Sequence, residues 1–103
     1  MSEASRLKLQ SKFEELLGTR FVYYNPPESK KMEYPAIRYS KKSIDVKYAD
    51  NMRYSMMDCY EVIVISTETD DPVNEKILAL PYCSFDRSYQ AGGLDHDVYT
   101  IFY

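Results

Sequence analysis

The feature that most constrains the fold is a run of seven residues, Tyr60–Ser66 (YEVIVIS). In a strand, successive side chains point to opposite faces, so Tyr60, Val62 and Val64 share one face while the two isoleucines share the other. A strand that is apolar on both faces is buried on both faces. The chain must therefore cover both sides of a sheet. If its helices lie on one side, either the sheet folds over on itself or another subunit covers the other side.

The first helix is predicted over residues 3–17 because its apolar residues recur at helical spacing. These residues are Leu9, Phe13, Leu16 and Leu17. Gly18 follows directly and is suited to end a helix in the left-handed conformation.

A second, shorter helix is predicted after residue 71. Asp71 is a suitable N-cap and Pro72 fits the first helical position. Pro81 is expected to end the helix, since proline cannot continue one. The apolar stripe comprises Val73, Ile77, Leu78 and Leu80.

The remaining segments predict strands. The expected ranges are 20–24, 36–49, 52–66, 83–89 and 96–103. Asp50-Asn51 is a turn signal, so 36–49 and 52–66 are predicted to form a long hairpin. A turn over residues 90–95 (QAGGLD), with Gly92-Gly93, joins the last two strands. The fold class expected is α+β, with a mainly antiparallel sheet, a long hairpin and two helices.

Length and composition favour one domain over residues 1–103 that folds without a cofactor, metal or disulfide. The chain has 103 residues, of which 45% are hydrophobic, enough to build a core. The formal net charge is −3, without the basic excess of a chain that grips nucleic acid. No apolar stretch approaches the ~18 residues of a membrane span, and residues 1–17 lack the apolar region of a signal peptide. We expect a soluble protein made inside a cell.

Residue types that carry chemistry are present but scattered, which predicts a protein that is not an enzyme. Cys59 and Cys83 lack a CxxC spacing and are expected to be reduced thiols. His96 lies between Asp95 and Asp97, but in a strand it points away from both. A metal site or a Cys–His dyad is the less favoured interpretation, and we expect no catalytic residues.

The order of several longer runs resembles a family of small bacteriophage tail proteins, described as tail terminator, tail completion or minor structural proteins. The runs are YYNPPESKKMEYPAIRY, YADNMRY, YEVIVIS with an acidic-Pro helix start after it, LPYCSFDRSY and LDHDVYTIFY. The resemblance covers Tyr23 to Tyr103 and rests on the order and spacing of these runs.

That resemblance implies a virion structural protein, assembled in the host bacterial cytoplasm and located in the tail or neck. Tail terminators form a ring, commonly hexameric, at the head-proximal end of the tail tube. The implied partners are further copies of the chain, the major tail tube protein and the neck or connector proteins. DNA passes through the lumen of the ring without specific binding.

The tip of the expected long hairpin is the candidate contact with a neighbouring subunit or with the tube, because it combines charge with tyrosine. Its residues are Tyr48, Asp50, Asn51, Arg53 and Tyr54. A hairpin tip exposed only to solvent is an equally supported interpretation. Two further functions stay open: a head-closure (stopper) protein of the neck, and a small binding module that uses some of the chain's 11 tyrosines to hold a ligand or peptide.

Overall fold

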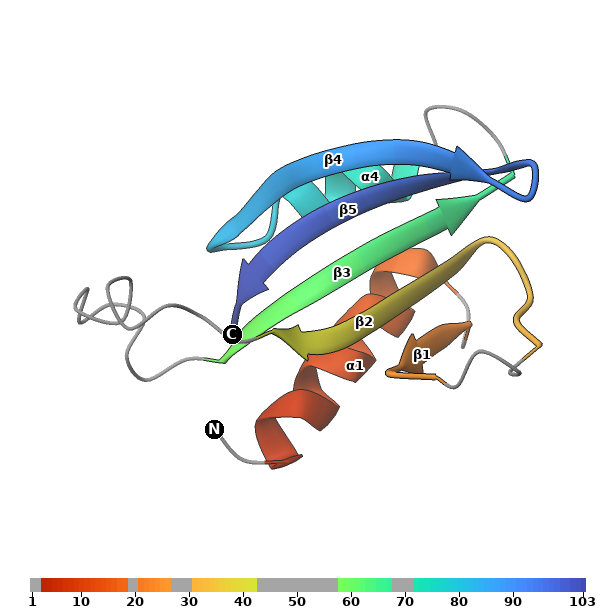
Figure 1. The fold of residues 1–103 in the computed structure, drawn as a ribbon. Coiled ribbons are helices and arrows are strands. Elements are labelled where there is room, and N and C mark those ends of the chain that lie inside the picture. Colours follow the sequence, from red (N-terminus) through yellow and green to blue (C-terminus); the bar gives the residue numbers. More distant parts are fainter. Residues whose placement is uncertain (1–2, 19–20, 27–30, 43–57, 68–71) are drawn as a thin grey trace.

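The computed structural model describes residues 3–18, 21–26, 31–42, 58–67 and 72–103. They form a five-stranded sheet with two helices (Figure 1). The elements are α1 (Glu3–Leu17), β1 (Val22–Tyr24), β2 (Ala36–Lys42), β3 (Cys59–Ser66), α4 (Pro72–Leu78), β4 (Cys83–Ala91) and β5 (Leu94–Phe102). The α+β class with a mainly antiparallel sheet is confirmed.

The strand order is β1-β2-β3-β5-β4, so the doubly apolar strand β3 lies at the centre of the sheet. It pairs antiparallel with β2 and with β5, while β1 joins β2 as a short parallel edge. The last strand of the chain is therefore inserted between β3 and β4. This arrangement explains the hydrophobicity of β3, because a central strand has neighbours on both sides as well as two faces to bury.

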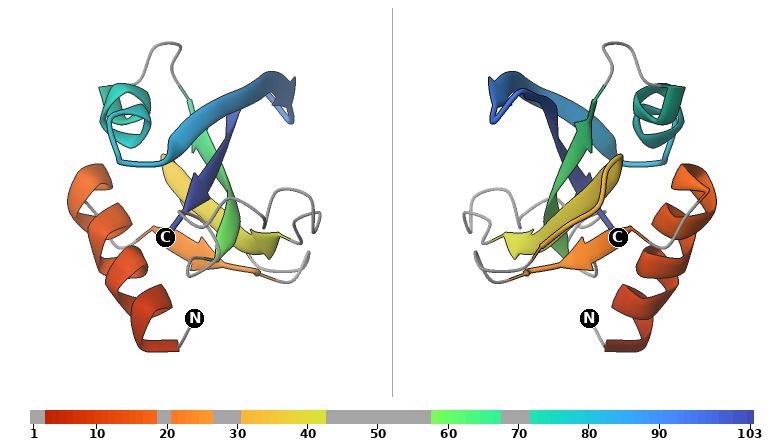
Figure 2. Two further views of the ribbon diagram at one scale, coloured as in Figure 1. Left: turned by 90° about the vertical axis from the view of Figure 1, so that its left-hand side faces the viewer. Right: turned by 90° about the vertical axis from the view of Figure 1, so that its right-hand side faces the viewer.

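Both helices lie against the same face of the sheet, as the end-on views show (Figure 2). We call this the helix-covered face. Its core combines α1, α4 and alternate residues of the strands. The fully buried members include Leu9, Phe13, Ile37, Val62, Val64, Ile77 and Ile101. The apolar residues whose helical spacing predicted the two helices thus include those that pack against the sheet.

The opposite face, which we call the open face, carries no described helix, yet several of its side chains are buried in the single chain. Ile65 is 3% exposed, and Ala36 and Val98 are 0% exposed. The sheet is twisted, and its two ends curve to the side away from the helices (Figure 2). The helix-covered face of β3 is therefore buried, whereas on its open face Ile65 is buried and Ile63 is only half-buried, so the prediction of a strand buried on both faces holds in part.

The helix ends show where the local signals were sufficient. α1 has the predicted limits, and Gly18 ends it with φ 80° while its N–H donates to the Glu14 carbonyl at 2.8 Å. In contrast, α4 ends at Leu78, before Pro81. The predicted role of Leu78 in the apolar stripe is wrong, since its side chain is 49% exposed. It follows the buried Ile77 directly and so lies about 100° around the helix from it.

The strands of the last hairpin are longer than predicted. They run over Cys83–Ala91 and Leu94–Phe102, and only Gly92-Gly93 remains as the turn. The two glycines have φ of 58° and 76°, and positive φ at both positions gives the tight turn that matches the twist of a hairpin. Pairing therefore continues to Ala91↔Leu94.

The other predicted hairpin is described only in part. β2 and β3 pair antiparallel from Ala36↔Ile65 to Lys42↔Cys59, as expected. The predicted extensions of these strands and the turn at Asp50-Asn51 lie outside the described residues. The first predicted strand, 20–24, is observed as Val22–Tyr24.

Candidate functional site

The five residues predicted as a subunit or tube contact all lie outside the described residues. They are Tyr48, Asp50, Asn51, Arg53 and Tyr54. The described residues that flank them contact each other and the last residue of the chain. Lys41 Nζ lies 3.5 Å from Asp58 Oδ2, and the Tyr103 N–H donates to the Asp58 carbonyl at 2.9 Å. Asp58 and Tyr103 therefore lie at the same end of the sheet.

The structure does not bring His96 together with either cysteine. His96 is opposite Ile65, whereas Cys59 is opposite Phe102, six residues further along β5. At about 3.4 Å per residue the separation is roughly 20 Å. Cys83 is opposite Ile101, five residues from His96, or roughly 17 Å. A Cys–His dyad within one chain is therefore excluded for these residues.

The surroundings of His96 and the cysteines are those of structural residues. The His96 ring stacks on Tyr89 at 4.7 Å, and its Nδ1 lies 3.1 Å from the Leu94 carbonyl. Burial raises the pKa of the Cys83 thiol to about 11 and also raises that of Cys59. Since the thiolate is the nucleophile, both thiols are weak nucleophiles at neutral pH. Within the described part of the chain, no group of three or more His, Cys, Asp or Glu side chains is placed to hold a metal ion.

Several of the tyrosines are core residues. Tyr39 packs edge-on against Phe13 at 5.2 Å and against Tyr60 at 6.0 Å. Its hydroxyl donates to Gln10 Oε1, and the Gln10 amide donates to the Val22 carbonyl at 3.0 Å. This polar contact joins α1 to β1 and β2, so Tyr39 satisfies its hydroxyl while burying its ring.

Burial of tyrosine predicts a loss of stability in alkali. Burial, with the Asp97 charge second, raises the pKa of Tyr99 to about 12, and burial raises that of Tyr60 to about 12. The unfolded chain releases these protons near pH 10, so the folded state binds more protons between about pH 10 and pH 12. Stability therefore falls as pH rises through that interval.

Urea denaturation at a series of pH values, with tyrosinate absorbance followed in parallel, measures this effect. Tyr99→Phe removes one of the groups, so its stability should fall less steeply with pH than that of the original chain. Equal slopes for the two proteins would contradict the assignment to Tyr99.

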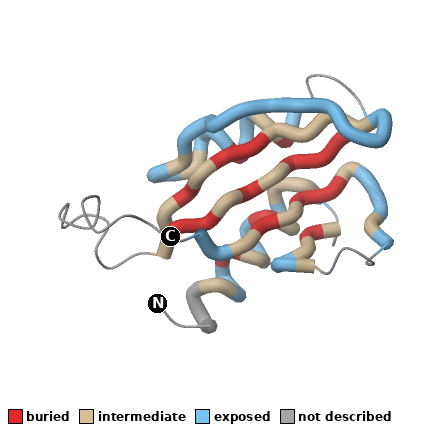
Figure 3. The backbone as a smooth tube through the Cα atoms, viewed as in Figure 1, coloured by how far each residue is buried: buried red, intermediate tan, exposed pale blue. Residues whose placement is uncertain are grey.

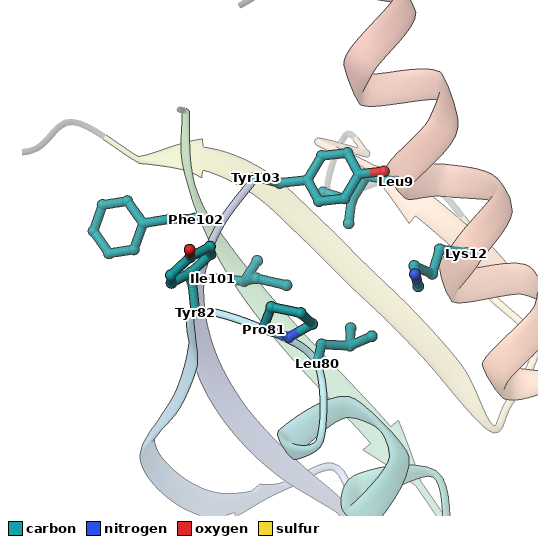
Figure 4. A pocket seen from close by; sticks show the side chains of 8 residues that line it. All are labelled: Leu9, Lys12, Leu80, Pro81, Tyr82, Ile101, Phe102 and Tyr103. Atoms are coloured by element: carbon teal, nitrogen blue, oxygen red, sulfur yellow. The ribbon is translucent and has the colours of Figure 1, made fainter. Parts of the chain in front are cut away.

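An apolar pocket of about 290 Å³ lies between α1, the α4–β4 connection and the end of β5 (Figure 4). Its lining residues are Leu9, Lys12, Leu80, Pro81, Tyr82, Ile101, Phe102 and Tyr103. Lys12 is the one charged side chain in this lining. The pocket is near the lower end of the size range of ligand sites and is large enough for an aromatic ring. Three segments far apart in the sequence build it, so local patterns did not reveal it.

The long outer strand β4 is the second exposed feature. It is an edge of the sheet over nine residues, and every residue from Ser84 to Ala91 is exposed (Figure 3). Phe85 is 52% exposed and Tyr89 is 41% exposed. The opposite edge, β1, has only three residues. An edge strand presents unpaired backbone N–H and C=O groups to which another strand can add, so β4 is a candidate interaction surface.

The comparisons with known proteins identify no relative. No family model matches the chain, and searches of the curated proteins and of the solved structures find no match. Among the described residues, neither helix has the length and hydropathy needed to cross a membrane.

Proposed function

We propose that this chain is a structural subunit of a bacteriophage tail: a tail terminator that forms a hexameric ring, caps the tail tube and joins it to the neck. The observation that carries the proposal is the order of the sequence runs between Tyr23 and Tyr103 that resemble this family. The ring has no catalytic role.

The placement of the reactive side chains supports an assembly role. His96 is engaged with Tyr89, and the two cysteines lie apart from it with raised thiol pKa values. The exposed surface instead carries aromatic residues, a kind that is enriched where proteins meet. They are Tyr24, Tyr34, Tyr82, Phe85 and Tyr89.

Electron microscopy of the purified chain, alone and mixed with tail tubes, tests the proposal. Ring-shaped particles are expected at one end of each tube, and tube growth should stop there. The triple variant Tyr48→Ala, Arg53→Ala, Tyr54→Ala should fold but cap poorly if the segment 43–57 contacts the tube or a neighbour. Tube ends that stay bare at saturating protein would refute the assignment.

A ligand- or peptide-binding module is the second candidate, and the pocket beside Lys12 favours it. An apolar lining with one ammonium group suits a small amphipathic molecule that carries a negative charge. The same preparations distinguish the two functions. Native mass spectrometry would show a monomer with a bound small molecule for the module, whereas the ring subunit assembles on tubes without one.

A further inference from the structure

The edge strand β4 has a feature that the tail ring does not use: two opposite charges at adjacent positions in the middle of the strand. The Arg87 guanidinium lies 2.8 Å from Asp86 Oδ2, and both side chains are well exposed. A strand that carries adjacent opposite charges at its centre is complementary to an antiparallel copy of itself. In such a pair, Asp86 of each copy is opposite Arg87 of the other, and opposite charges across a strand pair attract.

A β-bulge at Asp86 makes this the register in which both halves of the strand can pair. Phe85 is opposite Tyr99 and Arg87 is opposite Val98, so Asp86 is the extra residue in β4. The alternation of faces therefore shifts at this point. Before the bulge, Phe85 shares the helix-covered face with Tyr99, whereas after it Arg87 shares the open face with Val98.

Residues directly opposite each other in two paired strands must lie on the same face. With the two-fold axis between Asp86 and Arg87, this condition holds along the strand. Phe85 is then opposite Ser88 of the second copy, both on the helix-covered face, and Ser84 is opposite Tyr89, both on the open face. If one strand is shifted by two positions relative to the other, the pairs next to the axis no longer match. A residue on the helix-covered face is then opposite a residue on the open face.

We infer that two copies of this chain associate through β4 in antiparallel register, with a two-fold axis between Asp86 and Arg87. Their sheets join into one sheet of ten strands, five from each copy. Such a contact uses the same surface twice and closes on itself, so it gives a dimer and no larger assembly. A terminator ring requires head-to-tail contacts instead. The β4 dimer is therefore a state of the free protein, separate from the proposed ring.

One opposing effect is built into the same strand. Bulges and charged side chains commonly protect an edge strand from pairing. In the two-fold dimer, however, the bulges of both copies lie together at the axis, and the charges form attractive pairs. Charge reversal therefore distinguishes the two effects. Charges of either sign on the edge strand protect it from pairing, whereas the dimer requires opposite charges at positions 86 and 87.

Sedimentation equilibrium of the full chain at low salt, over a range of concentrations, tests the inference. The original chain is expected to show a monomer–dimer equilibrium. Asp86→Arg or Arg87→Asp alone replaces two attractive pairs by two repulsive ones, so each should weaken dimerisation by about tenfold. The double variant Asp86→Arg, Arg87→Asp restores opposite charges across the axis and should restore the dimer.

Lys76→Glu is the matched control. It makes the same change in net charge as Arg87→Asp at an exposed position on α4, and dimerisation should be unaffected. Circular dichroism confirms that each variant is folded. A monomer at every concentration, or a double variant as weak as the single ones, would overturn the inference. Six-fold particles on tail tubes, with no β4 dimer in the free protein, would contradict the β4 dimer and support the proposed ring. A β4 dimer that never caps tubes would support the dimer and contradict the ring.

Discussion

Replacing Phe13 with alanine is expected to lower the free energy of unfolding by about 3–5 kcal/mol. Phe13 is 0% exposed on α1 and packs edge-on against Tyr39 of β2 at a centroid distance of 5.2 Å. The substitution removes the ring and leaves a cavity where the helix meets the sheet. Since a domain of this kind is stable by about 5–15 kcal/mol, the loss is a large fraction of the total.

Leu7→Ala on the same helix is the control. Its side chain is 51% exposed, so its loss should change the free energy of unfolding by no more than about 0.5 kcal/mol. Urea denaturation followed by far-UV circular dichroism measures both variants. Similar losses for the two would show that α1 does not attach to the sheet through the face that contains Phe13.

The helices were the most predictable part of the fold because their signals are local. The spacing of Leu9 and Phe13 and the glycine at position 18 describe α1 to its last residue. The same reasoning placed too many residues on the buried side of α4. Adjacent Ile77 and Leu78 are both hydrophobic, and only packing decides that Ile77 is buried while Leu78 is exposed.

The arrangement of the sheet was less predictable because it depends on contacts between distant segments. The sequence of β3 indicated a strand buried on both faces, and the structure buries Val62, Val64 and Ile65 but leaves Ile63 half-buried. Nothing local indicated that β5 lies between β3 and β4, or that β4 is left as a long exposed edge. Val98 on the open face is also buried, although no described helix covers it.

The same limit applies to the candidate sites. The apolar pocket combines Leu9 of α1 with Pro81 and Ile101, which are far apart in the sequence. The separation of His96 from Cys59 and Cys83 likewise follows from strand register, which sequence patterns did not supply. The hairpin tip predicted as a partner contact lies outside the described residues and remains a prediction.

Under the proposed function, deleting this chain from a phage that encodes it should produce filled heads and tails of uncontrolled length that fail to join. A tail tube grows by stacking identical rings, and each ring exposes the surface to which the next one binds. Such a head-to-tail contact does not close and continues indefinitely. Ending it requires a subunit that matches the tube on one side and differs from it on the other.

The chain has two unlike sides of this kind. One side of its sheet carries both helices, and the other carries no helix among the described residues (Figure 2). A ring of such subunits can present one surface to the tube and another to the neck. The formal charge of −3 per subunit also suits a lumen through which DNA must pass, because net negative charge does not favour binding of phosphate.

Electron microscopy of lysates of the deletion mutant measures the outcome through the distribution of tail lengths and the state of the heads. Expression of the chain from a plasmid should restore both the original tail length and joining, which excludes effects on neighbouring genes. Tails of normal length together with heads that leak their DNA would indicate a head-closure protein instead. In that case the terminator assignment would be wrong, but a structural role at the head–tail junction would stand. A stopper acts on the head side of the same junction and leaves tube growth unaffected.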